Sequence, residues 1–414
     1  MPYLLTDGYI LTMDNCRTIH PSGFVLTNEA GRIEAVGPMT ACPDAADAER
    51  IDCAGRFVLP GLIDSLHVHW QHLFPGMGAD AALADRLDAG GHRLAAQLAG
   101  RALAAGGVTT ALFEMPASLD AATVRGIIDT ISRQGVQAIA AVAPALAADV
   151  LGALVGVVAD PESLTKGRIS EASIRDGFRT ARDLSRRVLL RVAPQGTDAL
   201  EQIGAERRAG RSTVYHLMEM GLLDQTCLLV CPPVLDDLDR SLIEESGCHV
   251  IGLPLADGMR GTGSGAFSAL ARAGVPCVLG SDGPGFAWSS DMLEQIKVAV
   301  MAQNTLLLDP NAMSFERALE MATVNSVSAL GLDTQTGALA PGLRADIAVF
   351  DATQPHQLVS AKPLSAFLAT TRATEAAVVL TAGLRQAPPK ALDLAAARTA
   401  RSAALVGADQ RVDA

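Results

Sequence analysis

The chain has 414 residues, which is long enough for one large domain with a smaller one beside it. Its 33 Lys and Arg residues against 45 Asp and Glu residues give a formal net charge of -12, which argues against nucleic acid and anionic membrane surfaces as partners. Seven widely spaced cysteines, no signal peptide and no apolar run of membrane-spanning length lead us to expect a soluble cytoplasmic protein.

Short β-rich runs separated by turns fill both ends of the chain. They comprise residues 9–13, 23–27, 32–37 and 51–56 near the start, and residues 337–351 and 376–380 near the end. Their alternation with turn residues predicts antiparallel strands. Residues 391–414 are rich in alanine and are predicted to form a C-terminal tail without chemistry.

Between these ends, candidate strands alternate with helical patterns. After a first strand near residue 60, strands are predicted at residues 107–113, 136–142, 153–158, 188–192, 227–230, 249–252 and 276–280. Helices are predicted between them, for example at residues 170–185, 236–245 and 292–304. This alternation is typical of an α/β fold with a closed parallel sheet, and it predicts a (β/α)8 TIM barrel.

The first barrel strand carries two histidines, His67 and His69, one residue apart. Side chains on a strand alternate between its two faces, so both imidazoles share a face and can bind one metal ion. Residues 60–69 resemble the opening motif of the amidohydrolase superfamily, in its cytosine deaminase and chlorohydrolase-like branch, which reads Pro-Gly-Leu-Ile-Asp, one residue, then His-x-His. Residues 320–325 and 337–351 are similar to the C-terminal signature of the same family.

This resemblance implies both an architecture and a class of function. It implies a barrel over residues 59–335 and a small β-sandwich built from residues 1–58 and 336–390. It also implies a hydrolase or deaminase that acts on a non-peptide carbon–nitrogen bond of a small molecule. One divalent metal, zinc or iron, and a homo-oligomeric assembly are typical of the family.

The opening motif departs from the family by one residue. Ser65 and Leu66 stand between Asp64 and the first histidine, where the family has a single residue. A slip of one residue on a strand turns every following side chain to the opposite face. Two alternatives follow: a β-bulge at Ser65 and Leu66 keeps both histidines inward, or Leu66 and Val68 occupy the ligand positions.

The last strand ends at residues 279–283 with Leu-Gly-Ser-Asp-Gly, which matches the family's Gly-Thr/Ser-Asp-Gly. The resemblance implies that Asp282 binds the metal and accepts a proton from the attacking water; the alternative is a plain Asp-Gly turn. On the same basis, His67, His69 and Asp282 form the metal set if a metal is bound. Asp282 and His69 are the predicted catalytic residues.

Two further ligand positions of the family are changed. Arg191 and Cys231 stand where the fifth and sixth strands of the family carry histidines, and Pro194 replaces a glutamate. A cysteine thiolate can bind zinc, but cysteine on a barrel strand is more often a small buried apolar residue. Arginine stays protonated and repels a divalent cation, whereas it suits a carboxylate. We therefore expect an impaired metal site, with Arg191 facing the barrel mouth beside Asp282.

Substrate contacts are predicted at the same mouth. The candidates are Trp70, His72, Arg191, Cys231, Arg260 and Trp288. A glycine-rich loop at residues 254–265 offers backbone amides to an anionic group, or is a plain turn.

Three functions stay open on these residues. The first is a metal-dependent hydrolase or deaminase. The second is a metal-independent enzyme on the same barrel, with Arg191 as an anion clamp, running an elimination, isomerisation or hydrolysis. The third is a non-catalytic binding relative. Arg191 favours substrates that bear a carboxylate over neutral nucleobases.

Overall fold

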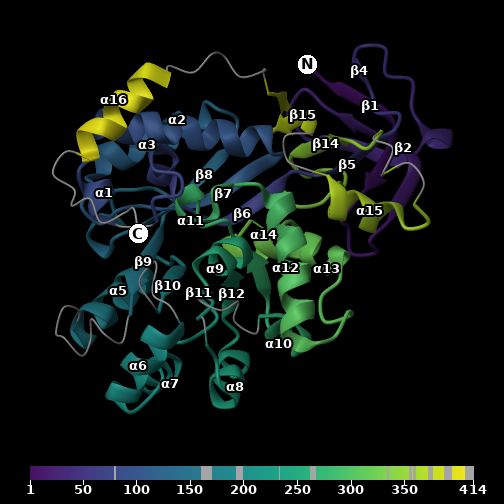
Figure 1. Cartoon of the computed structure of the whole chain (residues 1–414). Helices are drawn as coiled ribbons and strands as arrows, with labels where there is room; N and C mark the ends of the chain where they lie inside the picture. The colour runs from purple at the N-terminus through teal and green to yellow at the C-terminus, as the bar shows by residue number, and fades with distance from the viewer. Residues whose placement is uncertain are drawn as a thin grey trace.

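The computed structural model describes residues 1–78, 81–159, 170–192, 199–232, 234–261, 267–332, 335–353, 357, 360–371, 376–386 and 394–405. Pro194 and residues 262–265 of the glycine-rich loop lie outside the described residues. The described chain forms a parallel barrel surrounded by helices, with a second sheet beside it (Figure 1).

Eight parallel strands in chain order form the barrel, which confirms the fold predicted from the sequence. They are β6 (Leu62–His67), β7 (Val108–Glu114), β8 (Gln137–Val142), β9 (Leu154–Val158), β10 (Val188–Arg191), β11 (Cys227–Val230), β12 (His249–Gly252) and β13 (Cys277–Leu279). The amides of Ser281 and Asp282 donate to the carbonyl of Leu66 at 3.1 and 2.9 Å, so the last strand meets the first at their carboxyl ends. These carboxyl ends form the mouth of the barrel, where barrels of this kind carry their chemistry.

Alternation along the strands decides which side chains fill the barrel. Alternate residues of the strands form one buried apolar cluster, which includes Ile63, Leu112, Leu189, Leu228 and Val278. Their neighbours, such as Leu190 and Leu229, pack with helix side chains in a second cluster. Burial of one such side chain contributes roughly 1.5–3 kcal/mol, so the alternation is strongly favoured. A polar residue that continues the inner row at a strand end therefore points into the mouth.

Helices cover the outside of the barrel (Figure 1). The longer ones are α2 (Ala89–Ala105), α3 (Ala121–Ser132), α5 (Glu171–Asp183), α6 (Ala199–Ala209), α8 (Asp237–Ser246) and α12 (Met292–Leu307). The shorter ones are α1 (Ala81–Asp85), α7 (Thr213–Glu219), α9 (Pro254–Arg260), α10 (Phe267–Arg272), α11 (Pro284–Ala287), α13 (Phe315–Met321) and α14 (Val324–Leu330). Side-chain caps at Asp88, Ser170 and Asp236 accept the free amides of the first turn, which fixes where α2, α5 and α8 begin.

Three 3-10 helices connect these elements: η1 (Met39–Ala41), η2 (His69–Leu73) and η3 (Pro144–Leu146). None of the helices in the described part of the chain is both long and apolar enough to cross a membrane.

Both chain ends contribute to the second sheet, as predicted, and its strands are hydrogen-bonded as one sheet, whereas a β-sandwich was expected. Its strands are β1 (Tyr3–Leu11), β2 (Ile19–Thr27), β3 (Ile33–Pro38), β4 (Glu49–Asp52), β5 (Arg56–Pro60), β14 (Ile347–Asp351), β15 (Ala376–Thr381) and β16 (Leu384–Arg385). β14 pairs with β5 in antiparallel register, with Ile347 opposite Pro60. Because β5 leads directly into β6, this pairing attaches the sheet to the start of the barrel.

The C-terminal helices lie apart from one another. α15 (Pro363–Thr370) packs near the second sheet, where the Phe367 ring stacks on Phe57. α16 (Leu394–Leu405) lies beside α2 (Figure 1), and its Ala404 shares an apolar cluster with Leu83 and Ala95. The tail predicted at residues 391–414 therefore includes a helix that packs on α2 and η2.

Candidate active site at the barrel mouth

A β-bulge absorbs the extra residue of the opening motif. In the pairing of β6 with β7, Asp64 lies opposite Ala111 and His67 lies opposite Phe113. Three steps along β6 thus match two steps along β7, which places the extra residue at Ser65 and Leu66. The predicted bulge is therefore present, but it does not keep both histidines inward: Leu66 joins the inner apolar cluster, and His67, at the carboxyl end of β6, lies opposite Phe113 of the cluster that faces the helices.

His67 is fully buried and is held by hydrogen bonds at both ring nitrogens. Its Nδ1 lies 3.0 Å from Asp64 Oδ2 and 2.8 Å from Ser281 Oγ. Its Nε2 lies 3.0 Å from Nε2 of His72, whose ring also lies 3.4 Å from Ser290 Oγ. A carboxylate beside Nδ1 favours a hydrogen on that nitrogen, which leaves Nε2 of His67 as the proton acceptor. His72, a predicted substrate contact, thus lies in direct contact with His67.

His69 leaves the face that it was predicted to share with His67. β6 ends at His67, and the chain turns into η2 from His69 onward. Nε2 of His69 lies 3.1 Å from Nδ1 of His92, on α2. Burial lowers the pKa of His69 well below its usual value, and the neighbouring His92 and His67 lower it further. The structure therefore pairs His69 with a residue that sequence analysis missed, and not with Asp282.

Asp282 lies between two arginines. Arg191 Nη2 donates to its Oδ1 at 3.0 Å, and Arg260 Nη2 contacts its Oδ2. Burial raises the pKa of Asp282, but the charges of Arg260 and Arg191 outweigh this effect and lower it below the usual value. The predicted contact between Arg191 and Asp282 at the mouth is confirmed. A carboxylate held in this way is a weak proton acceptor.

Glu114 completes the group and was missed from the sequence. It is the last residue of β7, two positions beyond the inward Leu112. Arg191 donates to it twice, from Nε to Oε1 at 3.2 Å and from Nη2 to Oε2 at 2.6 Å. Burial lowers the pKa of Arg191, but Glu114 and Asp282 raise it above the usual value. Glu114 could have been identified from the sequence, because it lies two residues after Leu112 and therefore on the same, inward face of the strand.

Arg260 reaches the same carboxylate from α9, the helix after β12. Its Nη1 lies 3.6 Å from Asp257, and its guanidinium carbon lies 4.5 Å from the centre of the Phe286 ring. Its Nε is buried and has no hydrogen-bond partner among the described residues. Arg260, predicted only as a substrate contact, is thus held beside Asp282 by an ion pair and by a cation–π contact with Phe286.

Two predicted substrate contacts pack in apolar clusters, and a third is exposed to solvent. Cys231 follows the outward row of Cys227 and Leu229, packs against the outer core, and has a thiol whose pKa burial raises well above its usual value. The Trp70 ring packs in an apolar cluster 6.2 Å from the centre of the Phe74 ring. Trp288 is 65% exposed. The predictions for Cys231 and Trp70 are corrected, because alternation and burial turn these side chains into cores.

The residues present do not fit the divalent metal that the family resemblance implies. Both carboxylate oxygens of Asp282 face guanidinium groups, and His69 faces His92. Among the residues that the structure describes, no three His, Cys, Asp or Glu side chains come close enough to hold a metal ion. Two arginine charges therefore stand beside the carboxylate that the family uses as a ligand.

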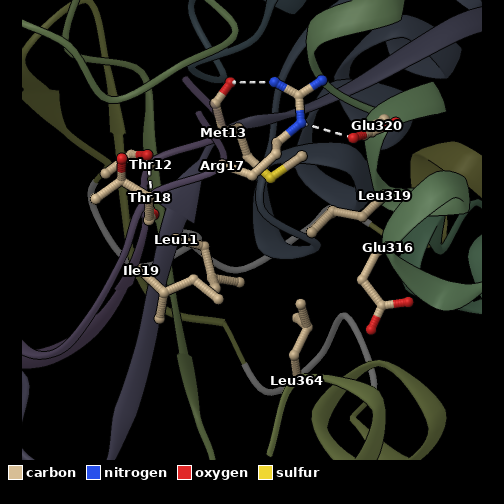
Figure 2. A pocket seen from close by; sticks show the side chains of 10 residues that line it. All are labelled: Leu11, Thr12, Met13, Arg17, Thr18, Ile19, Glu316, Leu319, Glu320 and Leu364. Carbon is tan, nitrogen blue, oxygen red and sulfur yellow. Dashed lines mark hydrogen bonds and ion pairs between the residues drawn. The ribbon is translucent and has the colours of Figure 1, made fainter. Parts of the chain in front are cut away.

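A separate apolar pocket of about 100 Å³ lies between the second sheet and α13 (Figure 2). Leu11, Met13 and Ile19 line it from the sheet side, and Leu319 lines it from α13. An ion pair between Arg17 Nε and Glu320, 2.6 Å long, lies at one side of it. The pocket shares no lining residue with the group at the barrel mouth, so the two sites are distinct.

Comparison with known sequences shows one family over most of the chain. A sequence model described as "Amidohydrolase family" matches residues 57–384. A 5-methylthioadenosine/S-adenosylhomocysteine deaminase of Symbiobacterium thermophilum is 27% identical, with 85% of this chain and 86% of the relative covered. A 5'-deoxyadenosine deaminase of Methanosarcina mazei is 26% identical, with 85% of each chain covered.

Solved structures show the same fold. An adenosine deaminase from Xanthomonas campestris with bound zinc superposes with a TM-score of 0.80 at 18% identity, covering 98% of each chain. A mutant atrazine chlorohydrolase from Arthrobacter aurescens TC1, complexed with zinc and atraton, gives a TM-score of 0.81 at 17% identity, covering 97% of this chain and all of that one. Both of these solved structures contain zinc.

Proposed function

Because the chain belongs to the amidohydrolase family, we propose that its barrel mouth hydrolyses a non-peptide carbon–nitrogen bond of a small molecule. The names of the relatives favour deamination, in which water replaces an amino group and ammonia leaves. The structural observation that carries the proposal is the group of Glu114, Arg191 and Asp282 at the ends of three barrel strands, with His67 at the end of a fourth. Reactive groups at this end of a barrel are typical of its enzymes.

His67 is the residue best placed to activate water. The Nδ1 contact with Asp64 fixes the ring and its tautomer, which leaves Nε2 to take a proton from the water. The same nitrogen, once protonated, can deliver the proton to the departing amine. In the structure described, His72 faces this Nε2 at 3.0 Å, so the attacking water has to take its place.

Asp282 has a different role in this proposal from the one implied by the resemblance. Its carboxylate is bound by Arg191 and Arg260, and its pKa is lowered, so it holds charge and position and does not accept the proton. The two guanidinium groups hold this carboxylate in place through two ion pairs.

No step of this mechanism passes through a metal, because the donor set does not fit one. A zinc or iron site at His67, His69 and Asp282 would require both arginines to leave Asp282 and His69 to leave His92. The predicted cytoplasmic location and homo-oligomeric assembly stay predictions.

The test is ammonia release by the purified full-length protein. The substrates are 5'-methylthioadenosine, S-adenosylhomocysteine and 5'-deoxyadenosine, taken from the relatives, together with amino-substituted ring compounds that carry a carboxylate. The His67→Asn variant is compared with His20→Asn, whose histidine lies on β2 of the second sheet. Release that persists in His67→Asn would remove His67 from the mechanism, and no release from any compound would count against the proposed reaction.

A further inference from the structure

We infer that the substrate carries a carboxylate, and that Glu114 occupies the place of this carboxylate on Arg191 while the site is empty. The inference rests on the proposed function and specifies its substrate class. It starts from the two-sided binding of Arg191, which continues the inner row of β10 after Leu189. One side of the guanidinium contacts Asp282 and the other contacts Glu114.

The contact with Glu114 has the geometry by which arginine recognises a carboxylate. Nε and Nη2 of Arg191 donate to separate oxygens of Glu114, at 3.2 and 2.6 Å. This two-point arrangement fits the planar fork of a guanidinium to a planar acid, and it is less suited to a neutral group. A substrate carboxylate could form the same pair of bonds.

The two acids on Arg191 differ in how firmly they are held. The Asp282 side chain is 0% exposed and is also bound by Arg260, whereas the Glu114 side chain is 24% exposed. Glu114 is therefore the acid on the solvent side of Arg191. An exchange of one carboxylate for another keeps the buried guanidinium compensated, which avoids the large cost of an unpaired buried charge.

Charge balance explains why the substrate has to replace Glu114 and cannot simply bind beside it. Arg191 and Arg260 supply two positive charges, and Glu114, Asp282 and Asp257 supply three negative charges. Among these five described side chains, no positive charge is left over while Glu114 is in place. When Glu114 moves away, one carboxylate restores the same balance, and the buried Nε of Arg260, which lacks a partner among the described residues, is a further donor in the group.

The test measures binding and does not depend on turnover. Malonate and succinate are the probes, malonamide is the neutral control, and isothermal calorimetry is used on the full-length protein. We expect Glu114→Gln and Glu114→Ala to bind the dicarboxylates roughly tenfold more tightly than wild type, since one competing charge-assisted pair is lost. The double variant Arg191→Met/Glu114→Gln, which removes one charge of each sign, should bind them no better than malonamide.

A matched control is Glu219→Gln, which breaks a similar ion pair with Arg211 on the surface. This variant should bind the dicarboxylates as wild type does. Unchanged or weaker binding in both Glu114 variants, or binding that survives in the double variant, would overturn the inference. Since binding is read directly, an absence of ammonia release would count against the proposed reaction alone.

Discussion

Arg191 Nη2 lies 3.0 Å from Asp282 Oδ1 inside the barrel, with only 6% and 0% of the two side chains exposed. The guanidinium of Arg191 therefore supplies a positive charge beside this carboxylate. Because both charges are removed from water, each depends on the other. This ion pair is the main difference between the site and the metal-binding arrangement that the family resemblance implies.

Removal of the guanidinium should destabilise the fold. In Arg191→Met, Asp282 loses one of its two cations and Glu114 loses both of its bonds to Arg191, so we expect the free energy of unfolding to fall by about 3 kcal/mol. Arg211→Met, which breaks a surface ion pair, should cost less than about 1 kcal/mol. Urea denaturation of both variants measures this. Equal losses of free energy in Arg191→Met and Arg211→Met would show that the buried ion pair contributes no more to stability than the surface pair.

A single substitution toward the family pattern should not create a metal site. Arg191→His supplies an imidazole at the fifth strand, but Cys231 packs outward at the sixth, and His69 stays paired with His92. We expect wild type and Arg191→His, both purified without chelators, to hold far less than one zinc per chain by elemental analysis. Stoichiometric zinc that disappears in both His67→Ala and His69→Ala would contradict the donor arrangement described here.

The buried histidine pair should make stability depend on pH. Burial lowers the pKa of His69, so between this value and about 6.5, the value expected for the unfolded chain, only the unfolded chain binds the extra proton. The free energy of unfolding therefore falls as the pH falls below about 6.5, by up to about 1.4 kcal/mol per pH unit for this residue. Denaturation at several pH values should show a smaller slope in His69→Gln and an unchanged slope in His20→Gln. Identical slopes in wild type and His69→Gln would refute the assignment.

The bulge should be sensitive to the strand that packs on it. A Cβ at Gly280 would lie 2.9 Å from both the Cβ and the backbone nitrogen of Leu66, so Gly280→Ala forces the backbone of the bulge to move. We expect a loss of roughly 1–3 kcal/mol in the free energy of unfolding. Gly126→Ala, in α3 with only the flexible Arg93 side chain near, is the matched control and should be neutral or stabilising. A neutral Gly280→Ala would mean that the bulge is not tightly packed.

The barrel and the bulge could be predicted because both leave a mark in the spacing of residues. Strand–helix alternation gave all eight barrel strands, and the extra residue at Ser65 and Leu66 had only two geometric outcomes. Glu114 was missed because it is a single polar residue in an apolar segment, and both Glu114 and His92 make their contacts with distant parts of the chain. Side chains alternate along a strand, so the outward positions of Cys227 and Leu229 already imply that Cys231 faces the helices.

Trp70 was predicted wrongly for a different reason. The loop after the first strand was expected to line the mouth, but it coils into η2, and the ring turns into an apolar cluster with Phe74 and Leu83. Whether a loop folds back onto a neighbouring helix depends on tertiary packing, which residue spacing does not encode.

Ammonia release in the presence of a strong chelator tests the central claim most directly, namely that this mouth hydrolyses its substrate with its own charged residues. The measurement uses the full-length protein, the best substrate from the panel and metal analysis of the same sample. Activity that is unchanged by the chelator and lost in His67→Asn is the predicted result. Activity that disappears with the chelator and returns with added zinc would contradict the account.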